Sequence, residues 1–85
     1  MCLMFDEKER LNNYIEKLKN GIKLSEDELE DFVKLSRKLR EYNPNEQLWI
    51  FLNGLAELLY SLSKIKLNLY DLVFNLMFST QKNSK

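Results

Sequence analysis

The fold of this chain is decided by residues 46–79, which read EQLWIFLNGLAELLYSLSKIKLNLYDLVFNLMFS. Leucine recurs here at every seventh position, at residues 48, 55, 62, 69 and 76. The positions three residues after the first four leucines are apolar as well, and they hold Phe51, Leu58, Ile65 and Leu72. Steps of three and four in alternation keep these side chains on one face of a helix. The stretch therefore predicts a helix of about 34 residues and about 50 Å, with an apolar seam that faces a partner as in a coiled coil.

The apolar seam is wider than that of an isolated two-stranded zipper. The positions beside it, where such zippers carry charged residues, hold Leu52, Leu59, Lys66 and Val73, so three of the four are apolar. Gly54 and Ser61 occupy the other flank, so no ladder of charges would hold two parallel helices in register. A stripe of this width favours a place in the core of a helical bundle.

The alternative to one continuous helix is a break near Asn68, after which the chain folds back to make a monomeric four-helix bundle. Asn68 could cap a separate fourth helix, with Asp71 three residues later. Tyr60, Leu67 and Phe74 lie on the side opposite the seam, which an isolated exposed helix should not tolerate. The helix therefore either breaks or has its back face covered. The heptad passes through Asn68 unshifted, and this favours continuity.

The first helix is expected to begin at Asp6, a favourable N-cap residue with Glu9 three positions later. It should stop at Asn20, because Gly21 follows and glycine is the usual residue just past a helix end. The helix would then cover about 6–20.

The second helix should begin after Ser25, which forms a capping box with Glu28. It should end near Tyr42, because Pro44 disfavours helical backbone at the residue before it. Asn45 would then cap the long helix. The sequence thus predicts one all-α domain over residues 1–85, with two short antiparallel helices and one long C-terminal helix, at about 6–20, 26–42 and 46–80.

Charge is balanced overall but unevenly placed along the chain. Lysine plus arginine and aspartate plus glutamate number 13 each, so no global field draws the protein to nucleic acid or to an acidic membrane. Residues 1–43 carry nine basic and ten acidic side chains, whereas residues 44–85 carry four and three. We expect the first half to be a solvated cover and the second half to supply the core and a contact surface.

No apolar run is long enough for a membrane span, which needs about 18–20 residues. The single cysteine, Cys2, cannot form an internal disulfide, and no signal peptide is evident. These features predict a cytoplasmic protein.

Residues that carry catalytic chemistry are scarce. Histidine is absent, which removes the commonest general base and the commonest zinc ligand. Gly21 and Gly54 stand alone, so no glycine-rich phosphate loop exists, and one cysteine cannot build a metal cluster. We expect no enzyme activity, no cofactor and no metal.

Two surface candidates remain, and they predict different partners. Lys34, Arg37 and Lys38 share one helical face and are the candidates for nucleic-acid contacts. Trp49, Tyr60 and Phe74 project away from the seam and are candidates for binding another protein, although most aromatic residues of this half are expected in the core.

A two-helix hairpin would cover only about half of a 50 Å helix, so a second copy is expected to cover the rest. The sequence therefore predicts a non-enzymatic homodimeric helical bundle that acts through protein–protein interaction, as an adaptor or inhibitor. The alternative is a small dimeric DNA-binding transcriptional regulator. The expected self-association residues are Leu55, Leu58, Leu62, Ile65, Leu69, Leu72 and Leu76.

Overall fold

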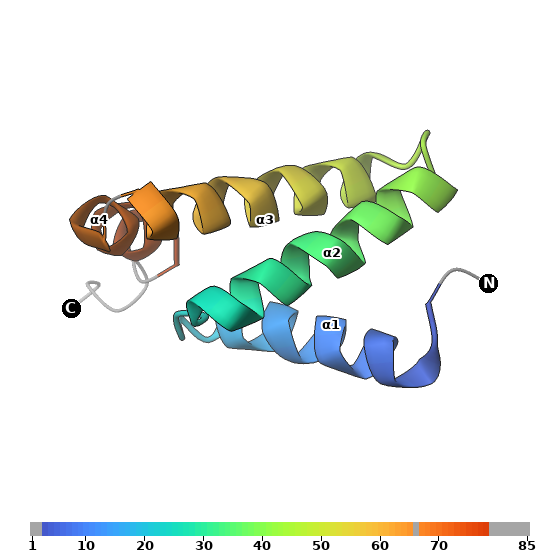
Figure 1. The fold of residues 1–85 in the computed structure, drawn as a ribbon, viewed down its shortest axis with the longest axis horizontal. Helices are drawn as coiled ribbons and strands as arrows, with labels where there is room; N and C mark the ends of the chain where they lie inside the picture. The colour runs from blue at the N-terminus through green and yellow to red at the C-terminus, as the bar shows by residue number, and fades with distance from the viewer. Residues whose placement is uncertain (1–2, 66, 79–85) are drawn as a thin grey trace.

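The computed structural model describes residues 3–65 and 67–78, and all the regular structure in them is helical. The helices are α1 (Phe5–Lys19), α2 (Glu26–Tyr42), α3 (Gln47–Ile65) and α4 (Leu67–Phe78). Successive helices α1, α2 and α3 run in opposite directions, and α2 lies between the other two (Figure 1). The predicted antiparallel pair at the start of the chain is confirmed. None of the described helices is both long and apolar enough to cross a bilayer.

The start of α1 differs from the prediction. The helix begins at Phe5, and Met4 precedes it as the N-cap residue. Glu7 closes this end, because its carboxylate accepts a hydrogen bond of 3.0 Å from the backbone N–H of Met4. Asp6 lies inside the first turn and forms an ion pair with Arg10 one turn later, at 3.2 Å.

The end of α1 follows the prediction closely. Gly21 has a φ of 73°, a left-handed conformation that costs glycine little. This backbone turn lets the N–H of Gly21 reach the carbonyl of Leu18 at 3.0 Å and the N–H of Ile22 reach that of Lys17 at 2.8 Å. These two bonds are the pattern of a Schellman motif, which satisfies carbonyls that the helix end would otherwise leave unpaired.

The predicted bounds of α2 are confirmed. Ser25 is its N-cap residue, and the Ser25 hydroxyl accepts a bond of 3.2 Å from the N–H of Glu28. The Glu28 carboxylate accepts one of 2.9 Å from the N–H of Ser25, which completes the capping box. At the other end the helix stops at Tyr42, two residues before Pro44.

Replacing Ser25 with alanine should lower the free energy of unfolding by about 0.5–2 kcal/mol, because the N–H of Glu28 loses its acceptor. Urea unfolding followed by circular dichroism measures this change. Ser25→Asp is the matched control and should keep most of the stability, since aspartate caps helices about as well as serine. An unchanged unfolding midpoint in the alanine variant would contradict the role of the cap.

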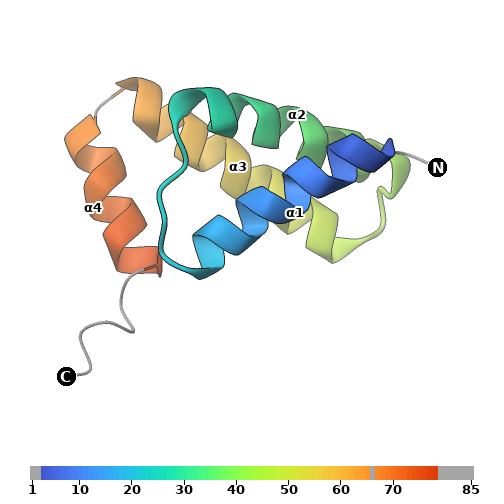
Figure 2. The ribbon, with the colours of Figure 1, turned by 90° about the horizontal axis from the view of Figure 1, so that it is seen from below.

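The continuous helix expected over 46–80 is wrong, because α3 ends at Ile65 and α4 begins at Leu67 in another direction (Figure 2). The alternative with a break is closer, although α4 begins at Leu67 and not after an Asn68 cap. At its other end α3 begins at Gln47, so Glu46 and not Asn45 directly precedes it.

The change of direction lets α4 reach the rest of the molecule. By helix geometry α2 is about 25 Å long and α3 about 28 Å, so α3 alone already spans α2. A straight continuation would leave Tyr70 and Phe74 with nothing to pack against. In the structure α4 instead lies against the connection between α1 and α2 (Figure 2). The Tyr70 hydroxyl donates a hydrogen bond of 2.9 Å to the carbonyl of Leu24, and Asp71 forms an ion pair with Lys23.

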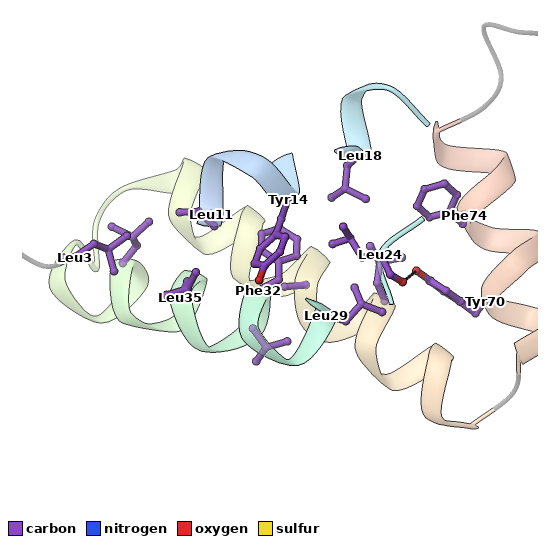
Figure 3. Packing of buried hydrophobic residues seen from close by; sticks show 14 residues of the cluster. Leu3, Leu11, Tyr14, Leu18, Leu24, Leu29, Phe32, Leu35, Tyr70 and Phe74 are labelled. Carbon is purple, nitrogen blue, oxygen red and sulfur yellow. Dashed lines mark hydrogen bonds between the residues drawn. The ribbon is translucent and has the colours of Figure 1, made fainter. Parts of the chain in front are cut away.

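One hydrophobic core joins all four helices (Figure 3). Tyr14 of α1 and Phe32 of α2 lie together at its centre, with ring centroids 6.1 Å apart. Leu24 lies between this pair and the rings of Tyr70 and Phe74 on α4 (Figure 3). The buried apolar residues are Leu3, Leu11, Tyr14, Leu18, Leu24, Leu29, Phe32, Val33, Leu35, Leu39, Ala56, Leu59, Tyr70 and Phe74.

Candidate interaction surface on α3 and α4

The side of α3 that faces the core is not the heptad seam. The buried residues of α3 are Asn53, Ala56 and Leu59. At 3.6 residues per turn, the opposite side of the helix lies on the surface of the molecule. We call this side the outer face of α3; it consists of Gln47, Ile50, Phe51, Gly54, Leu58, Ser61 and Ile65, all of them exposed.

The outer face of α3 includes part of the predicted seam. Phe51 is 62% exposed, Leu58 47% and Ile65 75%. Leu55 and Leu62 are partly buried and pack against the core, so they form the edge of the seam that turns inward. Of the expected self-association residues on α3, Leu58 and Ile65 are therefore the accessible ones.

A second row of exposed apolar side chains lies on α4. We call it the α4 row; it consists of Leu69, Leu72, Leu76 and Met77. Its first three members continue the heptad of α3 in sequence. They are exposed because Tyr70 and Phe74 occupy the side of α4 that packs on the core.

The charged side chains of α3 and α4 border this surface and are paired with other parts of the molecule. In the described part of α3 and α4, Glu57 pairs with Arg37 at 2.9 Å and Lys64 with Glu26 at 3.5 Å, while Asp71 pairs with Lys23. The hydrogen bond from Arg37 holds the pKa of Glu57 below its ordinary value.

Each of these pairs joins α3 or α4 to α2 or to the connection that precedes it. The outer face and the α4 row consequently contain no charged residue. Exposed helix faces of a protein that is 31% charged rarely lack charge, and depletion of charge is typical of the central part of protein interfaces.

The three aromatic partner candidates lie in different surroundings. Phe74 is 1% exposed and packs between Tyr70 and Phe78, with ring centroids 6.0 and 4.9 Å away. It is therefore a core residue and is removed from the candidates for partner contact. Trp49 and Tyr60 are partly buried and pack against the same core. The exposed aromatic residue of α3 is Phe51, which the sequence placed in the seam.

The basic candidates Lys34, Arg37 and Lys38 are exposed or partly exposed, but acidic side chains surround them. Arg37 is paired with Glu57, and the Lys38 ammonium donates to both carboxylate oxygens of Glu7 at 2.9 and 3.1 Å. The groove of about 430 Å³ beside them carries both signs of charge and is lined by Glu7, Arg10, Asp31, Lys34, Leu35, Arg37, Lys38 and Glu41. This surface is mixed in charge rather than basic.

The strongest polar contact between α1 and α2 was not predicted. Asp31 accepts hydrogen bonds from the Arg10 guanidinium at 2.7 and 3.2 Å and from the Tyr14 hydroxyl at 2.7 Å. The bonds from Arg10 hold the pKa of Asp31 below its ordinary value. Burial, together with the bond to Asp31, raises the pKa of Tyr14 to about 12. The cluster joins α1 to α2 through hydrogen bonds. It also shifts the pKa values of Asp31 and Tyr14 away from their ordinary values.

Stability should fall in acid partly through Asp31. Because its folded-state pKa is lowered, its contribution is present above the unfolded pKa of about 3.9 and is lost as the pH drops through the folded value. Asp31→Asn should therefore be less stable than the parent protein at pH 7, and the difference should shrink toward pH 2. Urea unfolding at several pH values measures this. Glu30→Gln, at an exposed neighbour, should show a smaller difference, and equal losses in both variants would contradict the assignment.

A buried polar network joins α2 to α3. The Asn53 amide donates to the Ser36 hydroxyl at 3.2 Å, and the Asn53 carbonyl oxygen accepts from Arg40 at 2.8 Å. Ser36 in turn donates to the carbonyl of Val33 at 3.2 Å. Among the described residues, every buried side-chain polar atom has a hydrogen-bond partner. The network therefore helps to fix which side of α3 faces α2.

An apolar hollow of about 270 Å³ lies where α1, α3 and α4 meet. Its lining consists of Ile15, Leu18, Lys19, Leu52, Leu55, Met77 and Phe78. It contains Leu55 from the partly buried edge of the seam and Met77 from the α4 row. Within residues 3–65 and 67–78, no group of three or more acidic or cysteine side chains is placed to hold a metal ion.

Comparison of the chain with protein-family models, with curated proteins and with solved structures found no match. The function is therefore inferred from the surface chemistry of this chain alone.

Proposed function

We propose that this chain is a non-enzymatic small helical protein that self-associates and acts through protein–protein interaction, as an adaptor or inhibitor. The observation that carries the proposal is the outer face of α3 together with the α4 row. Both are exposed, apolar and free of charged residues. The helices α1 and α2 carry both basic and acidic side chains and provide the solvated side of the same molecule. The single cysteine, Cys2, supports a reducing, cytoplasmic setting as part of this proposal.

The size of the apolar surface supports contact with a protein. Each large side chain of the outer face and of the α4 row exposes on the order of 100 Å², so each of the two surfaces, with four such side chains, exposes roughly 400 Å² of apolar area. Patches of about 300–600 Å² are the largest on a typical soluble monomer and are often functional. Water contact with a surface of this size is unfavourable by roughly 25 cal/mol for each Å², so covering it would stabilise an assembly substantially.

Sedimentation equilibrium at micromolar concentration tests self-association. One chain has a mass of 10.2 kDa, so a homodimer should sediment with about twice that mass. Circular dichroism on the same samples should show mainly helix. A mass of one chain at every concentration, with native helical content, would remove self-association from the proposal.

Binding of DNA is distinguished from this function by a salt titration on random duplex DNA. A DNA-binding regulator that used Lys34, Arg37 and Lys38 would lose affinity steeply with salt, since phosphate contacts release counterions. The ion pairs of Arg37 and Lys38 with Glu57 and Glu7 argue against this use. We expect no binding in such a titration. Pull-down experiments with both faces intact would then identify the protein partner.

A further inference from the structure

Gly54 lies in the middle of α3, where its own chain gives it no role. Glycine in a helix interior is destabilising relative to alanine, since it gains no side-chain contacts and loses more backbone freedom. A Cβ atom added at Gly54 would find no other atom within 4 Å apart from its own helix and its neighbours. Nothing inside the molecule therefore requires glycine here. Close approach of a backbone or side chain from outside the molecule would require it.

Large and small residues alternate along the outer face of α3. Phe51, Leu58 and Ile65 follow one another at seven-residue steps. Gln47, Gly54 and Ser61 follow at the same steps, four residues before each of the large ones. The row of residues 47, 51, 54, 58, 61 and 65 has the spacing 4-3-4-3-4, which reads the same in both directions. Its centre is residue 56.

A spacing of this kind is complementary to itself under a two-fold rotation. When two such helices lie antiparallel about residue 56, Leu58 of one faces Gly54 of the other and Phe51 faces Ser61. Phe51 and Leu58 of each copy then meet the small residues Ser61 and Gly54 of the other, while Ile65 meets Gln47. Pairing large with small side chains fills the space between two helices at close distance. In a parallel pair, large residues would face large ones and Gly54 would face Gly54.

We propose that the occupant of the outer face of α3 is a second copy of this chain, packed antiparallel through α3 with Leu58 over Gly54 and Phe51 over Ser61. This inference rests on the proposed self-association and adds its geometry. The same patch serves both copies, so the contact closes on itself as a two-fold dimer rather than growing into a filament.

The area of this face is sufficient for a dimer. Its four large side chains expose roughly 400 Å² on each copy, and Gln47, Gly54 and Ser61 add to this, so complete coverage would bury on the order of 1,000 Å² in total, about the minimum for a specific interface. Charge does not oppose the contact, because the face carries none and the flanking Glu57 and Lys64 are already paired with α2.

Disulfide trapping tests the direction of packing. In a Cys2→Ser background, Gln47→Cys and Ile65→Cys are made as separate chains, one of them carrying a tag that changes its mass. Residues 47 and 65 lie about 27 Å apart along α3, far beyond the about 7 Å that a disulfide allows between Cα atoms. Antiparallel packing therefore predicts cross-linked dimers only when the two chains are mixed. Efficient cross-linking of either chain with itself would overturn the inference.

Gly54→Leu tests the packing of large on small residues. The side chain has room in the single copy and favours helix, so the folded monomer should be at least as stable as before. It would meet Leu58 of the second copy, so the dissociation constant measured by sedimentation should rise more than tenfold. Asn12→Leu adds the same side chain at an exposed position of α1 and should leave the dissociation constant unchanged. Unchanged dimerisation in the Gly54→Leu variant would overturn the inference.

Different results would contradict self-association and its antiparallel geometry. If the parent chain sediments as a monomer, self-association is wrong and the geometry falls with it. If the parent chain is a dimer but the mixed chains do not cross-link, the geometry alone is wrong and the proposed function remains.

Discussion

Replacing Phe74 with alanine is expected to lower the free energy of unfolding by about 3–5 kcal/mol, a large part of the about 5–15 kcal/mol available to a small domain. Phe74 is fully buried, and its ring lies between those of Tyr70 and Phe78. Phe74 lies where α4 packs beside Leu18 and Leu24 of the core (Figure 3), so its removal would leave a cavity there. We expect a loss of roughly 4–8 °C in Tm for each kcal/mol.

Leu72→Ala is the matched control for Phe74→Ala. Leu72 lies on the same helix but is 55% exposed, so its truncation should change the unfolding of the monomer by much less. Thermal and urea unfolding, with all variants at one protein concentration, give the comparison. Equal losses at Phe74 and Leu72 would mean that α4 does not pack on the core as described.

Leu58→Lys is expected to convert the proposed dimer to a monomer without loss of helix. Leu58 is at the centre of the outer face of α3 and is exposed in the single copy, so lysine can reach water there. In an assembled pair the same ammonium would be buried without a partner, which costs several kcal/mol. The dissociation constant should therefore rise by at least a hundredfold. Sedimentation measures the mass, and circular dichroism measures the helical content.

Ile22→Lys is the control for Leu58→Lys, since Ile22 is also exposed and apolar but lies in the connection between α1 and α2. It should leave the mass unchanged. A Leu58→Lys chain that still sediments as a dimer would show that the outer face of α3 is not the contact. A Leu58→Lys chain without helix would place Leu58 in the fold itself, contrary to its exposure.

The ends of the first two helices could be predicted because short-range chemistry sets them. Gly21 takes the left-handed conformation that ends α1, and Ser25 with Glu28 closes the start of α2. Pro44 keeps α2 from continuing. In each case the deciding atoms lie within five residues of one another. The start of α1 was misplaced by this same logic, because Glu7 accepts the terminal N–H and leaves Asp6 to pair with Arg10.

The break between α3 and α4 could not be predicted from periodicity. A heptad records which residues share a face, and it stays in phase whether the helix continues or turns. What favours the turn is contact between residues far apart in sequence. Tyr70 bonds the carbonyl of Leu24, and Asp71 pairs with Lys23, across 46 and 48 residues.

The heptad predicted which residues of α3 share an apolar stripe, but not which of them are exposed. Leu58 and Ile65 are exposed, whereas Leu55 and Leu62 of the same stripe pack against the core. The sequence did not show that Asn53 faces the core. An amide within an apolar run is expected at the surface, and the hydrogen-bond partners that allow its burial, Ser36 and Arg40, lie on another helix. Phe74 was misassigned for the complementary reason: the turn of α4 buries a side that a straight helix would expose.

Among the described residues of α3 and α4, the charged Glu57, Lys64 and Asp71 are paired with residues before α3, so contacts on the outer face of α3 and the α4 row are chiefly apolar. Contacts of this kind gain their free energy near room temperature from the release of water, and that gain weakens on cooling. Sodium chloride, by contrast, screens charges and has little to act on at such a surface. Assemblies built on it should therefore loosen in the cold and tighten on warming, so that temperature, more than ionic strength, sets how much of the protein is assembled.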